Sequence, residues 1–328
     1  MVKTKNNLGT LVISLDMELM WGIIEKPTAN FYGQTNIRHV PTVIDRLLHL
    51  FKKYNIHATF GVVGFLLYED KESLMNDLPS RCPTYKREFL SPYNGYINTI
   101  KAEDCNLYFA PELIKKIAST EGMEIGSHTF CHYYCTEKGQ SLEQFREDVK
   151  KSFSIAEKNG YNLCSIIFPR NQVSPKYLEV CKEEGIKIYR GNPKKFFNES
   201  NNLIIRFINK ACRFADNYIP LSGCTSYSAK NIIDGEMFNI SASRFLRPYL
   251  KKIRFLEPLR FNRIKQEMTK AAKKGHIYHL WWHPHNFGAN MDDNFEFLEK
   301  LLKHFEDLHK KYGMKSKNMT DCAFEIIE

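Results

Sequence analysis

The sequence predicts an α/β protein in which parallel strands alternate with helices. Two observations lead to this prediction. Short apolar runs of strand length recur along the 328 residues, and segments with apolar residues at helical spacing lie between most of them. Strands joined through helices of this length pair in parallel and bury both faces of their sheet. No run of about 18 apolar residues occurs, so the sequence predicts no transmembrane helix.

The elements follow one another in a regular order. Thr10–Leu15 is an apolar run that predicts the first strand, and Val40–Tyr54 has the apolar spacing of a helix. His57–Val63 is predicted as the second strand. The later elements are a helix at Pro111–Thr120, a strand at Met123–Ser127, a helix capped by Ser141 and running to about Lys158, a strand at Cys164–Phe168, a helix at Ser174–Glu184, strands at Ile186–Tyr189 and His276–Trp282, and a helix at Asn294–Lys311.

Two segments interrupt this order. Residues 66–106 are rich in Pro, Asn, Tyr and charge, and residues 192–275 contain an irregular part with two candidate strands before a basic stretch. Long loops without structure are rare inside a compact domain. We therefore expect residues 1–328 to form a single domain in which the two segments are ordered insertions that shape a site.

Composition and cysteine use suggest a cytoplasmic protein. Hydrophobic residues make up 43% and charged residues 26% of the chain, which is typical of globular proteins. The nine cysteines form no CxxC pair, which favours reduced thiols over a disulfide framework or a zinc ribbon. Residues 1–10 lack the architecture of a signal peptide, so we expect a cytoplasmic location.

The positive charge is concentrated in one stretch. Residues 244–275 contain eleven Lys and Arg against two acids, which accounts for nine of the ten net positive charges. No nucleic-acid-binding motif accompanies it, so we expect no nucleic-acid partner. Aromatic residues alternate with the basic ones, as in helices that lie on an anionic membrane. A solvated face, or a surface that binds a phosphate-bearing soluble substrate, is the alternative interpretation.

Polar residues at the ends of the first and third strands suggest a metal centre. Asp16 and Glu18, at positions i and i+2, share one face of an extended strand. His128 and His132 meet on one face if the turn between them is helical, and paired imidazoles bind zinc and similar ions. Because ligands bind at the carboxyl ends of parallel strands, we expect these four residues to meet.

Two further strand ends supply the remaining chemistry. Arg170 and Asn171 follow the strand at residues 164–168, and an arginine there could hold a carboxylate in a bidentate pair. The late strand ends in Trp281, His283 and His285, so a histidine can serve as proton donor. The tryptophan ring offers a flat apolar surface for a sugar. Each residue alone is equally well explained as structural, but together they place a metal, a base, an orienting group and an acid on one rim.

These motifs resemble those of the polysaccharide deacetylase family, the NodB-homology fold of carbohydrate esterase family four. His128-Thr129-Phe130-Cys131-His132 matches the family's His-(Ser/Thr)-x-x-His motif, and Asp16-Met17-Glu18 resembles its first acidic motif. Pro169-Arg170 occupies the place of an Arg-Pro pair in reversed order. The end of the late strand and Ala58-Thr59-Phe60 are also similar to the family's motifs. The resemblance does not extend to the two insertions.

The resemblance implies a distorted (β/α) barrel and hydrolysis of an N-acetyl amide. It implies a divalent metal, zinc before cobalt or nickel, on Glu18, His128 and His132. Asp16 is then the general base and His283 the acid. The sequence leaves open whether Asp16 or Glu18 binds the metal and whether His285 replaces His283. The remaining roles are orientation of Asp16 by Arg170 and substrate binding by Trp281, His285 and Asn171.

A cytoplasmic deacetylase does not meet finished cell-wall polymer. The expected partner is therefore an N-acetylated saccharide that is lipid-linked or nucleotide-linked, in surface-polysaccharide biosynthesis, with residues 244–275 contacting an anionic membrane. Two alternatives remain. One is a hydrolase of a non-sugar amide or of a cyclic imide or ureide on the same fold. The other is a glycan-binding member of the family without catalysis.

Overall fold

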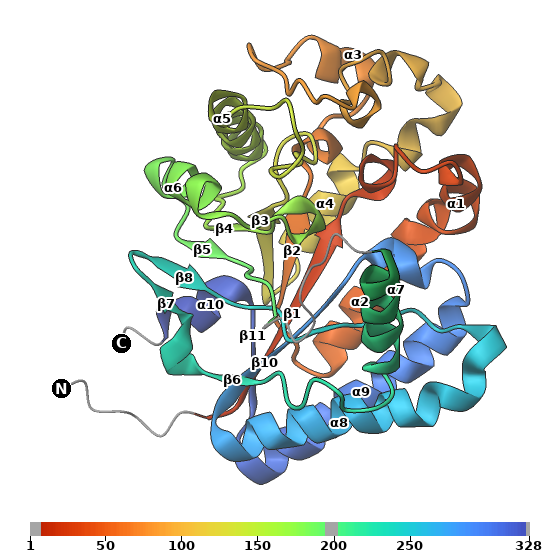
Figure 1. Ribbon diagram of the computed structural model, residues 1–328, viewed down its shortest axis with the longest axis vertical. Helices are drawn as coiled ribbons and strands as arrows, with labels where there is room; N and C mark the ends of the chain where they lie inside the picture. Colours follow the sequence, from red (N-terminus) through yellow and green to blue (C-terminus); the bar gives the residue numbers. More distant parts are fainter. Residues whose placement is uncertain (1–7, 194–202, 326–328) are drawn as a thin grey trace.

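The computed structural model describes residues 8–193 and 203–325. Its strands form one eleven-stranded sheet that curls into a half barrel with helices packed around it (Figure 1). The main order of the strands is β6-β10-β1-β2-β3-β4-β5-β8-β7, while β9 pairs with β10 and β11 pairs with β1. This architecture confirms the α/β fold class and the distorted (β/α) barrel expected from the sequence.

The centre of the sheet consists of parallel strands. β1 (Thr10–Met17) pairs with β10 (His276–Trp282) on one side and with β2 (Ala58–Val62) on the other. β3 (Met123–Ser127) follows β2. Every residue of β1 is buried, as expected for a parallel strand covered on both faces. The polar residues of β1 therefore need partners inside the protein.

The predicted helices agree with the structure to within three residues. α5 (Leu142–Lys158) begins with a capping box in which Ser141 and Gln144 exchange side-chain and backbone hydrogen bonds. The strands β4 (Ser165–Ile166) and β5 (Ile188–Tyr189) are shorter than predicted. The other confirmed helices are α2 (Val40–Lys53), α4 (Pro111–Ala118), α6 (Pro175–Glu183) and α9 (Met291–Tyr312).

The first insertion is ordered and consists mainly of short turns of helix. Its longest element outside the 3₁₀ turns is α3 (Lys71–Met75). The hydroxyl of Tyr85 accepts a hydrogen bond of 2.9 Å from the backbone N–H of Tyr134, just after the His motif. The insertion thus packs against the loop that follows β3. The 3₁₀ elements along this part of the chain are η3 (Gly64–Leu67), η4 (Glu88–Leu90), η5 (Ile97–Thr99) and η6 (Ala102–Leu107).

The second insertion is more regular than its sequence indicates. It includes α7 (Leu203–Ala215) and α8 (Glu257–Lys274), and α8 packs against α9 and β10. Its short strands extend both edges of the sheet. They are β6 (Tyr227–Ser228), β7 (Ile233–Asp234), β8 (Met237–Asn239) and β9 (Arg244–Phe245), with η8 (Ala229–Ile232) and η9 (Lys251–Leu256) between elements. Residues 194–202 of this segment lie outside the described residues.

Part of the basic stretch is internal. The guanidinium of Arg244 pairs with Glu267 at 2.8 Å, and Arg263 pairs with the same carboxylate at 3.1 Å. Arg260 pairs with Glu257. All three arginines are buried, so their charges are balanced within the fold. The charge that faces solvent comes from the remaining Lys and Arg side chains.

The remaining short elements complete the two ends of the chain. They are η1 (Leu19–Gly22), α1 (Ala29–Thr35), η2 (Ile37–His39), β11 (Lys315–Lys317) and α10 (Met319–Phe324). α10 is tied to the sheet by the carboxylate of Glu124 on β3. That carboxylate accepts hydrogen bonds from Thr59, Ser165 and Thr320. Among the described helices, none is long and apolar enough to span a membrane.

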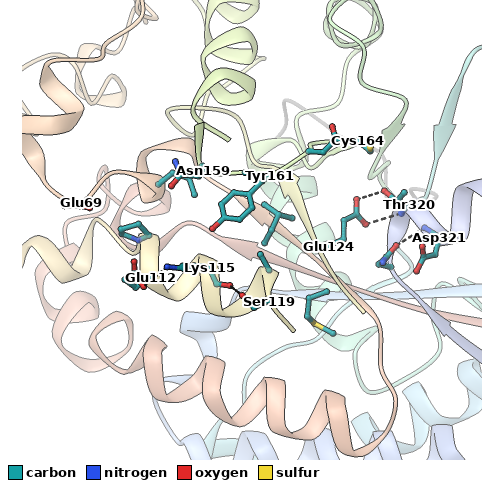
Figure 2. A pocket seen from close by; sticks show the side chains of 18 residues that line it. Glu69, Glu112, Lys115, Ser119, Glu124, Asn159, Tyr161, Cys164, Thr320 and Asp321 are labelled. Carbon is teal, nitrogen blue, oxygen red and sulfur yellow. Dashed lines mark hydrogen bonds and ion pairs between the residues drawn. The ribbon is translucent and has the colours of Figure 1, made fainter. Parts of the chain in front are cut away.

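A groove lies beside Glu124 at the starts of the strands. Figure 2 shows the Glu124 carboxylate directed at Thr320, with Lys115, Asn159 and Tyr161 along the same groove. None of the site residues expected from the sequence lines this groove. They lie at the opposite, carboxyl ends of the strands.

Candidate functional site

Residues from three strand ends meet around Glu18. Glu18 follows β1, His128 and His132 follow β3, and His283 follows β10. The imidazole Nε2 atoms of all three histidines lie within 3.5 Å of a Glu18 carboxylate oxygen. Because parallel strands end at one edge of the sheet, residues that are far apart in the sequence reach the same point.

Glu18, His128 and His132 form a compact buried group. The Nε2 atoms of His128 and His132 lie 3.4 and 3.0 Å from Glu18 Oε2. One ligand atom from each of the three residues lies within 4.8 Å of the others. Burial opposes ionisation of Glu18, but the neighbouring histidines hold the pKa of this carboxyl well below its ordinary value. Two imidazole nitrogens and one carboxylate oxygen are therefore close enough together to bind a single metal ion.

The Nδ1 atoms of the two histidines have partners outside the group, and their Nε2 atoms face Glu18. His128 Nδ1 lies 2.8 Å from the carbonyl oxygen of Ile167, so Nδ1 carries the proton and donates. Its Nε2 is buried without a hydrogen-bond partner. His132 Nδ1 lies 3.2 Å from the hydroxyl of Tyr134. A buried nitrogen lone pair without a partner, aimed at a carboxylate and a second imidazole, fits a divalent metal ion.

The loop after β3 brings the two histidines together without a helix. Thr129 and His132 adopt positive φ angles of 64° and 61°, a conformation that costs energy for residues other than glycine. The expected helical turn is therefore wrong, although the histidines still meet. The carboxylate of Asp148 on α5 accepts hydrogen bonds from the backbone N–H groups of Phe130 and Cys131 at 2.8 and 3.0 Å. Asp148 thus holds the loop in place.

Gly22 lies directly against Glu18, one of the three residues of the candidate metal site. A Cβ atom at this position would come within 2.0 Å of the carboxylate of Glu18. Any side chain here would displace that carboxylate, so the sequence after β1 requires a glycine at this point. Gly22 closes the 3₁₀ turn η1, which follows Glu18.

The carboxylate of Asp16 is held by Arg190. Two guanidinium nitrogens of Arg190 donate to the two carboxylate oxygens of Asp16 at 2.5 and 2.8 Å. Burial opposes ionisation of Asp16, but this bidentate pair keeps the pKa of the carboxyl below its ordinary value. Arg190 also donates to Ser14 and Asn171. The Asp16 carboxylate is therefore ionised and fixed in orientation.

His279 completes the buried network around Arg190. Its Nδ1 donates to the carbonyl oxygen of Ile240 at 3.0 Å, which leaves Nε2 to accept from the hydroxyl of Ser14 at 2.8 Å. Burial and the nearby Arg190 lower the pKa of His279 to about 3. This imidazole is neutral at physiological pH and serves to orient Ser14.

Arg170 does not hold Asp16, contrary to the prediction from the sequence. Its guanidinium pairs with Glu25 and lies 3.6 Å from Glu137, and it stacks on the ring of Tyr134 at 4.1 Å. The chain turns through positive φ at Arg170 (53°) and Asn171 (52°), and these three partners fix the guanidinium beside the His motif. The position beside Asp16 is taken by Arg190.

A chain of contacts links Arg170 to the histidine pair. The carboxylate of Glu25 pairs with Arg170 and accepts a hydrogen bond of 3.4 Å from the hydroxyl of Tyr134. The same hydroxyl lies 3.2 Å from His132 Nδ1. Arg170 is thus connected to His132 through Glu25 and Tyr134, and it does not contact Asp16.

The histidines after β10 differ in their access to solvent. The His283 side chain is 23% exposed, and its Nε2 lies 3.8 Å from Asp16 and 3.5 Å from Glu18. His285 is buried, stacks on His283 and meets the ring of Tyr32 edge-on. Trp281 lies beside His283, and the guanidinium of Arg190 covers its ring at 4.3 Å. Of the two candidate acids, His283 faces the open side.

An open cleft of about 740 Å³ begins at Trp281 and Asn171. Its size suits a small ligand or part of a larger one. From these two residues it extends towards α7 and the segment after β9. Its other polar or charged lining residues are Thr136, Arg170, Gln172, Asn192, Arg213, Asp216, Asn217, Ser222, Thr225, Ser243, Arg244 and Arg247.

The sequence did not reveal four residues of the site. Arg190 directly follows the predicted strand at 186–189, so its place at a strand end was a usable signal. Asp148 lies on the predicted helix at 141–158, where a buried carboxylate cannot be recognised from spacing. Glu25 and Tyr134 lie in loops without regular periodicity. Their roles depend on contacts that only the folded chain creates.

Comparison with known proteins agrees with this geometry. Residues 33–189 match the model of the family described as polysaccharide deacetylase. No curated protein matches the sequence. Solved structures share the fold, and three of them illustrate the degree of similarity to this chain. One is described as a putative polysaccharide deacetylase from Mycobacterium smegmatis, with 13% identity, a TM-score of 0.59, and coverage of 99% of this chain and 93% of that chain.

The other two are similarly distant in sequence. A probable polysaccharide deacetylase from Pseudomonas aeruginosa PAO1 is 14% identical, with a TM-score of 0.51 over 96% of this chain and 89% of that one. Puue allantoinase is 12% identical, with a TM-score of 0.53 over 98% and 91%. These likenesses concern the fold. The family assignment rests on residues 33–189, which match the polysaccharide deacetylase model.

Proposed function

We propose that this protein is a metal-dependent hydrolase that removes an N-acetyl group from a sugar. The observation that carries the proposal is the buried group of Glu18, His128 and His132, in which His128 Nε2 has no hydrogen-bond partner, directly beside Asp16 and His283. A metal site, an oriented carboxylate and an accessible imidazole are the parts that amide hydrolysis needs.

Glu18, His128 and His132 would hold the metal, most readily zinc, with cobalt or nickel as alternatives. Bound there, a divalent ion supplies Lewis acidity towards an acetyl oxygen and lowers the pKa of a bound water. Glu18 is the better ligand of the two acids because its carboxylate faces both histidines of the motif, whereas both oxygens of Asp16 are engaged by Arg190.

Asp16 and His283 divide the proton transfers. Asp16, ionised beside Arg190, accepts the proton of the attacking water as the new C–O bond forms. His283 donates a proton to the amide nitrogen as the C–N bond breaks, which prevents return of the amine. The products are acetate and a free amino sugar. Arg190 keeps Asp16 ionised and oriented through both transfers and is a positioning residue.

Of the three substrate-binding residues expected from the sequence, Trp281 and Asn171 keep that role. Trp281 offers a ring face beside His283, and Asn171 lines the same cleft. His285 acts behind His283, because it is buried and stacked on that ring.

The proposal for the carrier of the sugar is supported by the charge of the chain and by the location expected for it. We infer a cytoplasmic enzyme of surface-polysaccharide biosynthesis that acts on a lipid-linked or nucleotide-linked saccharide. Membrane contact is assigned to the exposed part of residues 244–275. Phe255 is 72% exposed and Leu259 is 47% exposed, and Lys251 and Lys252 are exposed beside them. Apolar side chains among lysines suit an anionic membrane surface.

Metal content and product release test the proposal. The purified protein should contain about one zinc, cobalt or nickel ion per chain by mass spectrometry, and His128→Ala/His132→Ala should lose it. His39→Ala/His49→Ala removes two exposed histidines elsewhere and should keep the metal. Proteins that contain the metal should release acetate from N-acetylhexosamine substrates, and the variant without metal should not.

Two results would overturn this proposal. A wild-type protein that stays without metal after reconstitution would favour glycan binding without catalysis. A metal-loaded protein that hydrolyses cyclic ureides or imides and releases no acetate would favour the non-sugar amide reaction.

A further inference from the structure

The cleft beside Trp281 is unusually rich in arginine. Arg170, Arg213, Arg244 and Arg247 line it, and Asp216 is the acidic residue among the lining side chains. Such a composition concentrates positive charge at one end of the candidate site. The question is which of these charges is already balanced within the protein.

Two of the four arginines have carboxylate partners. Arg170 pairs with Glu25 and Glu137. Arg244 pairs with Glu267, and Asp216 lies 3.5 Å from Arg244. Asp216 is also engaged by Arg263 and by the N–H and hydroxyl of Ser222. The carboxylate of Asp216 is therefore engaged by Arg244, Arg263 and Ser222. It does not neutralise the charges of the other two arginines.

Arg213 and Arg247 have no carboxylate partner among residues 8–193 and 203–325. Arg213 is exposed on α7, and its Nε donates to the backbone of Asn209. Arg247 is half-buried after β9, with its guanidinium 5.0 Å from the centre of the Phe214 ring. Burial lowers the pKa of Arg247, which reflects the cost of a charge without a counterion. Arg213 and Arg247 both line this cleft, so the two cations face the same space.

We propose that Arg213 and Arg247 bind the phosphate groups of a sugar carried on a diphosphate. The cleft runs from these arginines to Trp281 and Asn171, so a bound diphosphate places its sugar towards His283 and Asp16. Arginine suits this role because its planar donors match phosphate oxygens in pairs. This inference rests on the proposed function for the chemistry of the sugar, while the anion site stands on its own geometry.

The carrier is either a nucleoside diphosphate or a polyprenyl diphosphate, which share the group that the arginines bind. The test is calorimetric titration of the full-length protein with inorganic pyrophosphate, uridine diphosphate and farnesyl diphosphate. Arg213→Gln/Arg247→Gln should weaken binding of all three probes about tenfold or more, because charge-assisted hydrogen bonds to both arginines are lost. Arg38→Gln/Arg81→Gln removes two exposed arginines outside the cleft and should leave the affinities unchanged.

The pattern among the probes identifies the carrier. Tighter binding of uridine diphosphate than of pyrophosphate indicates a nucleotide, and tighter binding of farnesyl diphosphate indicates a lipid. The proposal is overturned if the wild-type protein binds none of the probes, or if the arginine variant binds them as the wild type does.

Failure of the proposed reaction is recognised separately. His128→Ala should abolish acetate release and keep the effect of the two arginines on pyrophosphate affinity. All comparisons between wild type and Arg213→Gln/Arg247→Gln are made with the His motif intact, so any binding of pyrophosphate at a metal is common to both proteins.

Discussion

Arg190 donates to both carboxylate oxygens of Asp16, although 174 residues separate the two in the chain. Both side chains are almost fully buried, at 0% and 4% exposure. Loss of one partner leaves an uncompensated charge inside the protein, which is more costly than loss of the pair. The pair therefore couples the stability of the sheet to the orientation of the proposed base.

Arg190→Met should lower the free energy of unfolding by about 3–5 kcal/mol, because Asp16 stays buried without its partner. Adding Asp16→Asn to Arg190→Met should restore part of this loss, and urea unfolding of the four proteins in the cycle measures the coupling. Arg170→Met serves as the matched control and should leave the cycle unaffected. An effect of Asp16→Asn on stability that is the same in the wild type and in Arg190→Met would show that the pair is not coupled.

Tyr134→Phe should weaken metal binding by about 10-fold to 100-fold, as is usual for partners that orient a metal-binding histidine. The reason is the contact of the Tyr134 hydroxyl with His132 Nδ1 and with Glu25. Competition with a chelator measures the affinity. Tyr133→Phe is the control, because its hydroxyl donates to Gln140 and Ser141 instead. The interpretation of the Arg170 network fails if both variants bind metal as the wild type does.

His283→Asn should reduce kcat for acetate release by about 10² to 10⁴, the range for loss of a general acid. His285→Asn should have the smaller effect, because His285 is buried behind His283. Steady-state kinetics at saturating substrate decides between the two. A larger loss of kcat in His285→Asn would move the acid role to His285.

The stability of the loop after β3 should depend on pH through Asp148. Burial raises the pKa of Asp148 to about 6 despite hydrogen bonds from Phe130 and Cys131. The ionised form is therefore disfavoured in the folded protein, so the contribution of Asp148 is most favourable at low pH. It falls as the pH rises from about 4 to about 6, by about 3 kcal/mol in total.

The comparison with Asp148→Asn isolates this contribution. The variant should lose one backbone contact at every pH, and its stability should lack the fall between pH 4 and pH 6. Urea unfolding at intervals across this range measures the difference between the two proteins. A difference that stays constant with pH would contradict the raised pKa.

Sedimentation with anionic liposomes should detect membrane contact at low salt and lose it at high salt, because exposed charges are screened beyond about 10 Å at 0.1 M salt. Lys251→Glu/Lys252→Glu should reduce binding about tenfold or more, since each lysine near an anionic surface contributes about 1 kcal/mol. Lys86→Glu/Lys138→Glu changes two exposed lysines elsewhere and should still bind. Absence of binding by the wild type at low salt would remove membrane contact from the proposal.

The central strands and their helices could be predicted because each is a self-contained pattern. β3 spans the residues predicted for it, and Ser141 caps α5 as expected. The second insertion was harder, because α8 carries basic residues that the folded chain buries. Arg263 and Glu267 neutralise each other in the interior, which spacing alone does not distinguish from a solvated pair.

In the candidate site, too, residues in local clusters could be predicted and residues that depend on distant contacts could not. Asp16, Glu18 and the histidines were found because they lie in local clusters at strand ends. Arg190 stands alone in its sequence neighbourhood, and its partners Asp16 and Asn171 come from other strand ends. Arg170 is also an arginine that follows a strand, so the sequence did not distinguish it from Arg190. Arg170 pairs with Glu25 instead of Asp16, and Glu25 lies in a loop after β1 that has no periodic pattern.

The place of β1 in the sheet affects how the protein is made. β1 carries Ser14 and Asp16 and leads into Glu18, yet its neighbours β10 and β11 are encoded near the other end of the chain. A nascent chain on the ribosome can form the β2–β3 pairing early, but β1 stays exposed on one edge until β10 has emerged. The proposed catalytic centre is therefore assembled late in translation, and shortened chains that end before β10 should expose an apolar edge suited to chaperone binding or aggregation.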